Sequence, residues 1–317
     1  MFDKVLVPVN GSPLAECVIP HAAAFAKVFN SHITLVHVLE QPTGSLALPK
    51  ADPLDWYLKK SEAMLYLDTV KARFEAVGIA SETILLQGRA SEQIIEMANN
   101  NKFDLLILSG SGDAENNRMS LSSTALKILQ DVRTSILLVR SNQPITTEIT
   151  DLSYQSLLVP LDGSQRAGAV LTLATALTQA HHAELMLVHI VSKPEMPRHM
   201  PPSQEDIELA NRFIERNQEE GSKYLEQMQM RLPANTQTQL LVSDNVAATL
   251  QTISEEQNTD LLVLSAHGYS GEARWNYGSV ANRFITNGTT SLLIVQDLPQ
   301  KSLTDTGQMR AVRQSVR

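Results

Sequence analysis

The chain has 317 residues, of which 43% are hydrophobic and 19% are charged, and its formal net charge is −8. This length and composition predict a folded protein of about two domains and exclude wholesale disorder. The acidic balance argues against a binder of nucleic acid or of anionic membranes, because either function would need a basic surface.

Cysteine content and the N-terminal stretch indicate where the protein works. Cys17 is the single cysteine, which excludes an internal disulfide or a cysteine zinc cluster. Residues 1–8 carry Asp3 and a short apolar run, unlike the hydrophobic region of a secretory signal. No apolar run approaches the roughly 20 residues that span a bilayer. We therefore expect a cytoplasmic protein that does not enter the membrane.

Strands and helices alternate along the first half of the chain. The pattern predicts helices over residues 12–29, 54–76, 91–100 and 122–131. It predicts strands over Lys4–Val9, Ile33–Leu39, Ser81–Leu86, Asp104–Ser109 and Ser135–Arg140. The second half repeats this order, with its long helix expected over Gln204–Arg231. Such alternation implies right-handed crossovers and a parallel sheet in each half.

The same segments occur twice in the same order. Val5–Ser12 recurs as Leu157–Ser164, and Asp104–Ser109 recurs as Asp260–Ser265. The segments 35–38 and 187–190 also match each other, as do 135–139 and 291–295. We interpret the chain as a tandem repeat of one α/β domain. The predicted domains are 1–142 and 154–297, with a linker over 143–153 and a C-terminal tail over 298–317.

Small and polar residues in the second half follow strands whose carboxyl ends meet in one crevice. Asp162 follows the first strand, and Gly268 follows the fourth strand shortly after Ser265. Nine residues separate Gly268 from Gly278 and Ser279, where a helix should begin with Ser279 as its N-cap. Backbone N–H groups at such a helix start attract anions. The pattern therefore predicts a phosphate site.

These residues resemble the universal stress protein family in its tandem form. The family signature is similar to Gly-x-x-Gly, nine residues and Gly-Ser/Thr after strand four, with an Asp after strand one in nucleotide-binding members. The resemblance implies two doubly wound α/β domains, each with a five-stranded parallel sheet in the order 3-2-1-4-5. It also implies a cytoplasmic stress-response role and ATP held between strands one and four.

The resemblance assigns roles to individual residues of the second half. Asp162 would contact the nucleoside, and the backbone of Ile190 would meet adenine. Ser265 stands in place of the first glycine, while Gly268 matches the second; His267 either reaches phosphate or is held by backbone contacts. The full set of candidate ligand-binding residues is Pro160, Asp162, Ile190, Ser265, His267, Gly268, Gly278, Ser279 and Val280. ATP, with or without Mg²⁺, is the implied ligand, and AMP or another adenine nucleotide is the alternative.

The first half departs from this signature. Asn10 replaces the Asp, and Ser109 and Ser122 replace two glycines, so only Gly112 stays in register. The segment 113–121 carries Asp113 and Glu115, which would repel a triphosphate. We therefore predict that the first domain keeps the fold and binds nucleotide weakly or not at all.

Three classes of function stay open on the sequence alone. The first is a nucleotide-dependent regulator, the second a slow ATP hydrolase and the third an interaction module without nucleotide. The sequence has no P-loop motif and no evident general base beside the glycine loop, so we expect at most weak ATPase activity. We also expect the halves to pair through Ile136–Val139 and Leu292–Val295, and the chain to form a homodimer.

Overall fold

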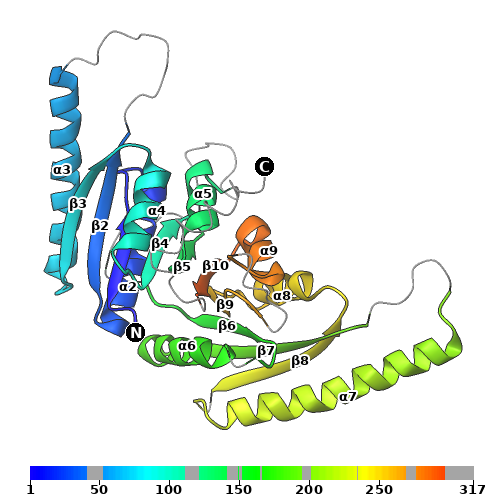
Figure 1. The fold of residues 1–317 in the computed structure, drawn as a ribbon. Helices are drawn as coiled ribbons and strands as arrows, with labels where there is room; N and C mark the ends of the chain where they lie inside the picture. Colours follow the sequence, from blue (N-terminus) through cyan, green and yellow to red (C-terminus); the bar gives the residue numbers. More distant parts are fainter. Residues whose placement is uncertain are drawn as a thin grey trace, which may run out of the picture.

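The computed structural model describes residues 1–40, 53–110, 121–140, 149, 152–164, 166–194, 201–233, 235–268 and 276–296. Two α/β halves share one ten-stranded sheet, with helices on both of its faces (Figure 1). No helix in these ranges is long and apolar enough to cross a membrane.

The first half alternates strands and helices as the sequence predicts. Its strands are β1 Lys4–Pro8, β2 His32–Leu39, β3 Ser81–Gln87, β4 Leu105–Ser109 and β5 Ser135–Val139. Its helices are α1 Pro13–Glu16, α2 Val18–Phe29, α3 Pro53–Ala76, α4 Ala90–Asn100 and α5 Ser123–Asp131.

The second half repeats the arrangement. Its strands are β6 Ser156–Leu161, β7 Glu184–Ser192, β8 Thr236–Ser243, β9 Leu261–Ser265 and β10 Ser291–Val295. Its helices are α6 Ala167–His181, α7 Gln204–Gln229, α8 Val246–Glu256 and α9 Ser279–Asn287.

The first helix differs from its prediction because it is broken in two. α1 ends and α2 begins at Cys17, which caps both. Pro20 in the first turn of α2 has no N–H for the carbonyl of Glu16, and its ring would crowd that carbonyl in a continuous helix. The break therefore follows from one proline that the apolar pattern of residues 12–29 conceals.

The strand order of each half is 3-2-1-4-5, as the resemblance implies. The full sheet runs β3-β2-β1-β4-β5-β10-β9-β6-β7-β8. Among the strands of the described residues, all neighbours within a half are parallel, and β5 and β10 pair antiparallel, with Leu137 opposite Leu293. The two halves thus meet along β5 and β10, and every strand of a half points its carboxyl end to one edge.

Both faces of the sheet are buried. In β1, Val5 and Val7 pack into the hydrophobic core with α2, while Leu6 faces the opposite core with α4 and α5. A strand that is buried on both faces has apolar residues at consecutive positions, which explains the continuous runs in the sequence.

Arg140 joins the two halves beside this pairing. Its side chain is buried and its guanidinium donates to the carbonyls of Phe284 and Ile285 at the end of α9. The backbone N–H of Arg140 donates to Ser291 Oγ at 3.1 Å. A cation at a helix C-terminus complements the helix dipole, so this contact ties the end of α9 to the first half.

Tyr154 forms a second contact between the halves, next to α2. Its ring is fully buried, and its hydroxyl lies 2.7 Å from Nδ1 of His21. The rings of Phe25 and His181 both meet it edge-on, at centroid distances of 6.3 and 5.1 Å. Burial lowers the pKa of His21 from 6.5 to about 4.

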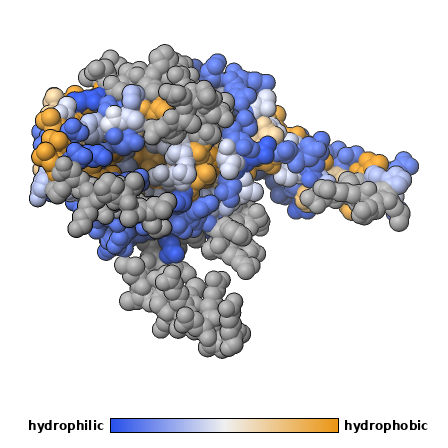
Figure 2. All heavy atoms as spheres, turned by 90° about the horizontal axis from the view of Figure 1, so that it is seen from above, coloured by the Kyte–Doolittle hydropathy of each residue, from blue (hydrophilic) through white to orange (hydrophobic). Residues whose placement is uncertain are grey.

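The N-terminal part of α7 projects from the body of the molecule (Figure 1). Apolar side chains lie exposed on it, among them Ile207, Leu209 and Phe213. Seen from above, this helix forms a narrow extension in which apolar and polar residues alternate (Figure 2). The helix is anchored further along, where Gly221 and Leu225 are buried.

We predict that Arg140→Met lowers the free energy of unfolding by about 1–3 kcal/mol, because the Ile285 carbonyl would lose a charged hydrogen-bond donor in a buried place. Urea unfolding of the full chain measures the change. Arg133→Met, at an exposed position near β5, is the matched control and should leave stability within about 0.5 kcal/mol of the wild type.

We also predict that stability falls as the pH drops from 6.5 towards 4. The unfolded chain protonates His21 near pH 6.5, whereas the folded chain resists protonation until about pH 4. The unfolded state therefore binds more protons in this window, and acid favours it. His21→Gln should flatten the pH dependence in urea melts, whereas His182→Asn, at an exposed position, should not. Equal slopes for wild type and His21→Gln would contradict this assignment.

Candidate functional site

The loop after β6 places Asp162 at the carboxyl edge of the sheet. The Asp162 side chain is exposed, and its Oδ1 accepts the backbone N–H of Ser164 at 2.9 Å. Gly163 between them has φ +80°, a conformation that glycine adopts without strain. The carboxylate therefore closes its own turn through one oxygen.

The loop after β9 is held by one hydrogen bond from a side chain and one from the backbone, both to backbone carbonyls. Ser265 Oγ donates to the carbonyl of His267 at 2.7 Å, and the N–H of Gly278 donates to the carbonyl of Ala266 at 2.7 Å. His267 is only 2% exposed. Of the two roles considered for His267, this burial favours a residue that supports the loop over one that reaches a phosphate.

Gly268 lies between Asp162 and Gly278. A Cβ added to Gly268 would come within 2.5 Å of Asp162 Oδ2, closer than real side chains approach. A Cβ added to Gly278 would lie 3.8 Å from the backbone nitrogen of Gly268. Three segments far apart in the sequence thus meet at one point, and the carboxylate reaches it only because residue 268 has no side chain.

The start of α9 differs from the prediction. Gly278 is the N-cap, with φ −71° and ψ 173°, and Ser279 is the first residue of the helix, so the N-cap predicted at Ser279 is wrong. Gly278 has no side chain to accept the N–H groups of the first turn. Ser279 is exposed and Val280 is half-buried. An anion at this helix start would meet backbone donors that the cap residue leaves uncovered.

Pro160 and Ile190 lie on the two neighbouring strands. Pro160 is half-buried in β6 and pairs with Val188 of β7, and Ile190 follows two residues later, also half-buried. His189 Nδ1 lies 2.7 Å from the carbonyl of Leu161, so this histidine is held by the neighbouring strand. The structure therefore places Ile190 beside the Asp162 loop along the same edge.

The sequence analysis missed two residues near Asp162. Arg166 Nη1 donates to the carbonyl of Gly268 at 3.2 Å. Tyr224 of α7 has a raised pKa, caused mainly by burial and also by the negative charge of Asp162. The repeat held a signal for the tyrosine, because Tyr66 meets His37 edge-on at 6.1 Å just as Tyr224 meets His189 at 6.0 Å. Nothing in the local pattern pointed to Arg166.

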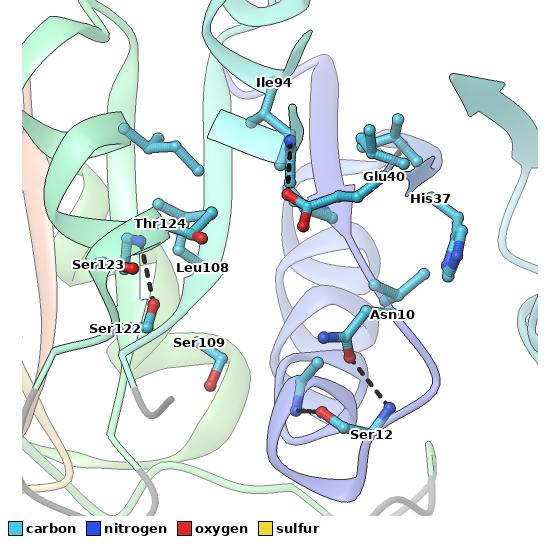
Figure 3. Close-up of a pocket in the computed structure, with 18 of the residues that line it drawn as sticks. Asn10, Ser12, His37, Glu40, Ile94, Leu108, Ser109, Ser122, Ser123 and Thr124 are labelled. Carbon is cyan, nitrogen blue, oxygen red and sulfur yellow. Dashed lines mark hydrogen bonds between the residues drawn. The ribbon is translucent and has the colours of Figure 1, made fainter. Parts of the chain in front are cut away.

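The matching edge of the first half carries a cavity of about 750 Å³ (Figure 3). Asn10 Oδ1 accepts the N–H of Ser12 at 3.0 Å, as Asp162 does with Ser164. Ser122 caps α5, since its Oγ accepts the N–H of Ala125 at 3.0 Å. The two halves therefore present different side chains from equivalent positions.

Some residues that the sequence analysis discussed lie outside the described ranges. They are Gly112, Asp113 and Glu115 in the first half, most of the predicted linker and the whole predicted C-terminal tail. Within the ranges that are described, no group of three or more His, Cys, Asp or Glu side chains could hold a metal ion.

The fold defines a class of protein: a tandem of two doubly wound α/β domains, in each of which the loops that follow the strands gather at the carboxyl edge of the sheet. The model of the universal stress protein family matches residues 1–140 and again residues 153–296. The chain belongs to the universal stress protein family.

Several known proteins are similar to this chain. Universal stress protein MJ0531 of Methanocaldococcus jannaschii is 26% identical over 141 residues, which is 44% of this chain and 83% of that protein. A solved universal stress protein from Archaeoglobus fulgidus is 17% identical, covers 93% of this chain and 99% of its own, and has a TM-score of 0.61. PA1789 of Pseudomonas aeruginosa, described as functionally unknown, is 12% identical over 98% of both chains, with a TM-score of 0.66. The two structures support the fold alone.

We predict that Gly268→Ala destabilises the protein by about 1 kcal/mol at most, because the new methyl group would push aside the exposed carboxylate of Asp162, whose Oδ2 would otherwise lie at 2.5 Å. Asp162→Ala should remove most of that penalty, so the two substitutions should be non-additive in urea unfolding. Additive effects of the two substitutions would contradict the contact.

Proposed function

We propose that the second domain binds an adenine nucleotide, with ATP as the first candidate, and that the chain acts as a nucleotide-dependent regulator or interaction module in the stress response. The observation that carries this proposal is the meeting of Asp162, Gly268 and the uncovered start of α9. Phosphate binding needs close backbone approach and free N–H donors, and nucleoside binding needs a hydroxyl acceptor nearby.

Each part of the crevice suits one part of the nucleotide. The first-turn N–H groups of Ser279 and Val280 would take the phosphates, aided by the positive end of the α9 dipole. Asp162 would accept from a ribose hydroxyl, since a carboxylate beside the phosphates would repel them. The backbone of Ile190 would meet adenine. Any Mg²⁺ would be held by the phosphates and water, since no group of three or more His, Cys, Asp or Glu side chains among the described residues could hold a metal ion.

A binding role is favoured over catalysis. Hydrolysis of ATP would need a positioned general base. Asp162 closes its own turn through Ser164, and His267 is buried in the loop after β9. Both side chains are therefore used to shape the site, which is why we propose a regulator rather than a hydrolase.

We also propose that the protein works in the cytoplasm and forms a homodimer. The exposed apolar side chains of α7, among them Ile207, Leu209 and Phe213, provide a surface that supports further association. The pairing of β5 with β10 would remain intact in such a dimer, because it already uses both of those strands.

We predict that Asp162→Ala weakens ATP binding roughly ten- to a hundredfold, which corresponds to the loss of a hydrogen bond to a charged group. Calorimetric titration of the full chain measures this change. Asn10→Ala, at the equivalent position of the first domain, is the matched control and should leave ATP affinity unchanged.

Three results would change the assignment. Equal ATP affinity in wild type and Asp162→Ala would remove this residue from the site. Tighter binding of AMP than of ATP would make AMP the ligand. An absence of binding by any adenine nucleotide would favour an interaction module.

A further inference from the structure

The first-domain cavity is a formed site that the assigned function leaves unused. By the first-domain cavity we mean the space of about 750 Å³ between the carboxyl ends of β1, β2 and β4 and the first turns of α4 and α5. This volume falls in the range of small-ligand pockets. Figure 3 shows polar groups of Asn10, Glu40, Ser122 and Thr124 around the same space. Val38, Ile94 and Leu108 supply aliphatic surface between them.

The carboxylate of this cavity stands on a different strand from the carboxylate of the second domain. In strand register, Pro8 pairs with Val36 as Pro160 pairs with Val188, so Asn10 corresponds to Asp162 and Glu40 corresponds to Ser192. The first domain therefore has an amide after its first strand and an acid after its second. The second domain instead has an acid after its first strand and a hydroxyl at the end of its second strand.

Glu40 is held in place by the helix next to it. Its Oε1 accepts the backbone N–H of Ala90, the first residue of α4, at 3.0 Å. This hydrogen bond places the Glu40 side chain against the N-terminus of α4 and fixes the direction in which its other oxygen points. A ligand that donates a hydrogen bond to its other oxygen would find the acceptor already oriented.

The helix start that faces this cavity suits an anion less well than α9 does. Ser122 Oγ accepts the N–H of Ala125, so one first-turn donor of α5 is taken by its own cap. Lys59 and Glu40 both line the cavity, so its lining carries one formal charge of each sign from these two side chains. Burial lowers the pKa of His37, which keeps that side chain neutral near pH 7. These groups give the lining no net positive charge to offset several phosphates.

We propose that the first-domain cavity binds an unphosphorylated nucleoside and discriminates against nucleotides. The aliphatic side chains would cover the faces of a base, and Glu40 would accept from its exocyclic amine. Asn10 and Thr124 would hydrogen-bond to the hydroxyls of the sugar. This inference does not depend on nucleotide binding in the second domain, because the two sites share no residue.

Hydrogen exchange on the full chain tests the proposal segment by segment. Adenosine should slow amide exchange in α4 and α5. The ATP concentration that gives half of the maximal protection of these helices should be at least tenfold higher than the corresponding adenosine concentration. No protection of either helix by adenosine, or equal protection by ATP, would overturn the proposal. Protection of α8 and α9 reports on the second domain separately.

Two substitutions should change the preference of the first domain for adenosine over ATP, whereas a general loss of folding would weaken the binding of both ligands. Ser122→Gly removes the side-chain cap of α5 and makes its helix start like that of α9, which has Gly278 at the cap. The ATP concentration that half-protects α5 should then fall several-fold, while the corresponding adenosine concentration should change little. Glu40→Gln should weaken the binding of adenosine to the first domain and strengthen the binding of ATP there. Ser192→Ala, at the position equivalent to Glu40, is the matched control and should leave both first-domain responses unchanged. If Glu40→Gln weakened the binding of adenosine and of ATP to the same degree, the proposed role of this carboxylate would be wrong.

Discussion

The antiparallel pairing of β5 with β10 is the constraint on which the rest of the structure depends. Both strands are almost wholly apolar, and each would be an exposed edge if its half stood alone. Pairing them joins two five-stranded sheets into one and buries both edges. Arg140 then reaches the C-terminal carbonyls of α9 from the end of β5, so the helix whose start forms the candidate phosphate site is anchored at its other end by the first half.

The shared fold constrains the strands more tightly than the loops that follow them. Strand residues pack on both faces of the sheet, so changes there disturb two cores at once. Residues just beyond the strands face the crevice and are free to differ. Asn10 against Asp162 and Ser122 against Gly278 are such differences, and each changes the polar groups at the edge of the sheet while the strand order stays the same. A repeated domain can therefore keep one architecture while the residues at its two strand ends differ, which is the basis of the two proposed sites.

The sequence predicts the fold well because its signals are local and repeated. Runs such as Leu261–Leu264 identify strands buried on both faces, and the duplication tests each assignment twice. The prediction fails where a single backbone feature decides the outcome, as at Pro20, which breaks the first helix, and at Gly278, which takes the cap position from Ser279. Arg166 and the first-domain cavity arise from side chains brought together by the fold, and no spacing in the sequence encodes them.

The most direct test of the central claim is a crystal structure of the full chain grown with ATP. The account predicts that the phosphates lie at the backbone N–H groups of Ser279 and Val280, with a ribose hydroxyl on Asp162. Phosphates at the start of α5, or nucleotide in both domains, would contradict the division between the halves. A structure with neither crevice occupied by ATP would contradict nucleotide binding by this chain.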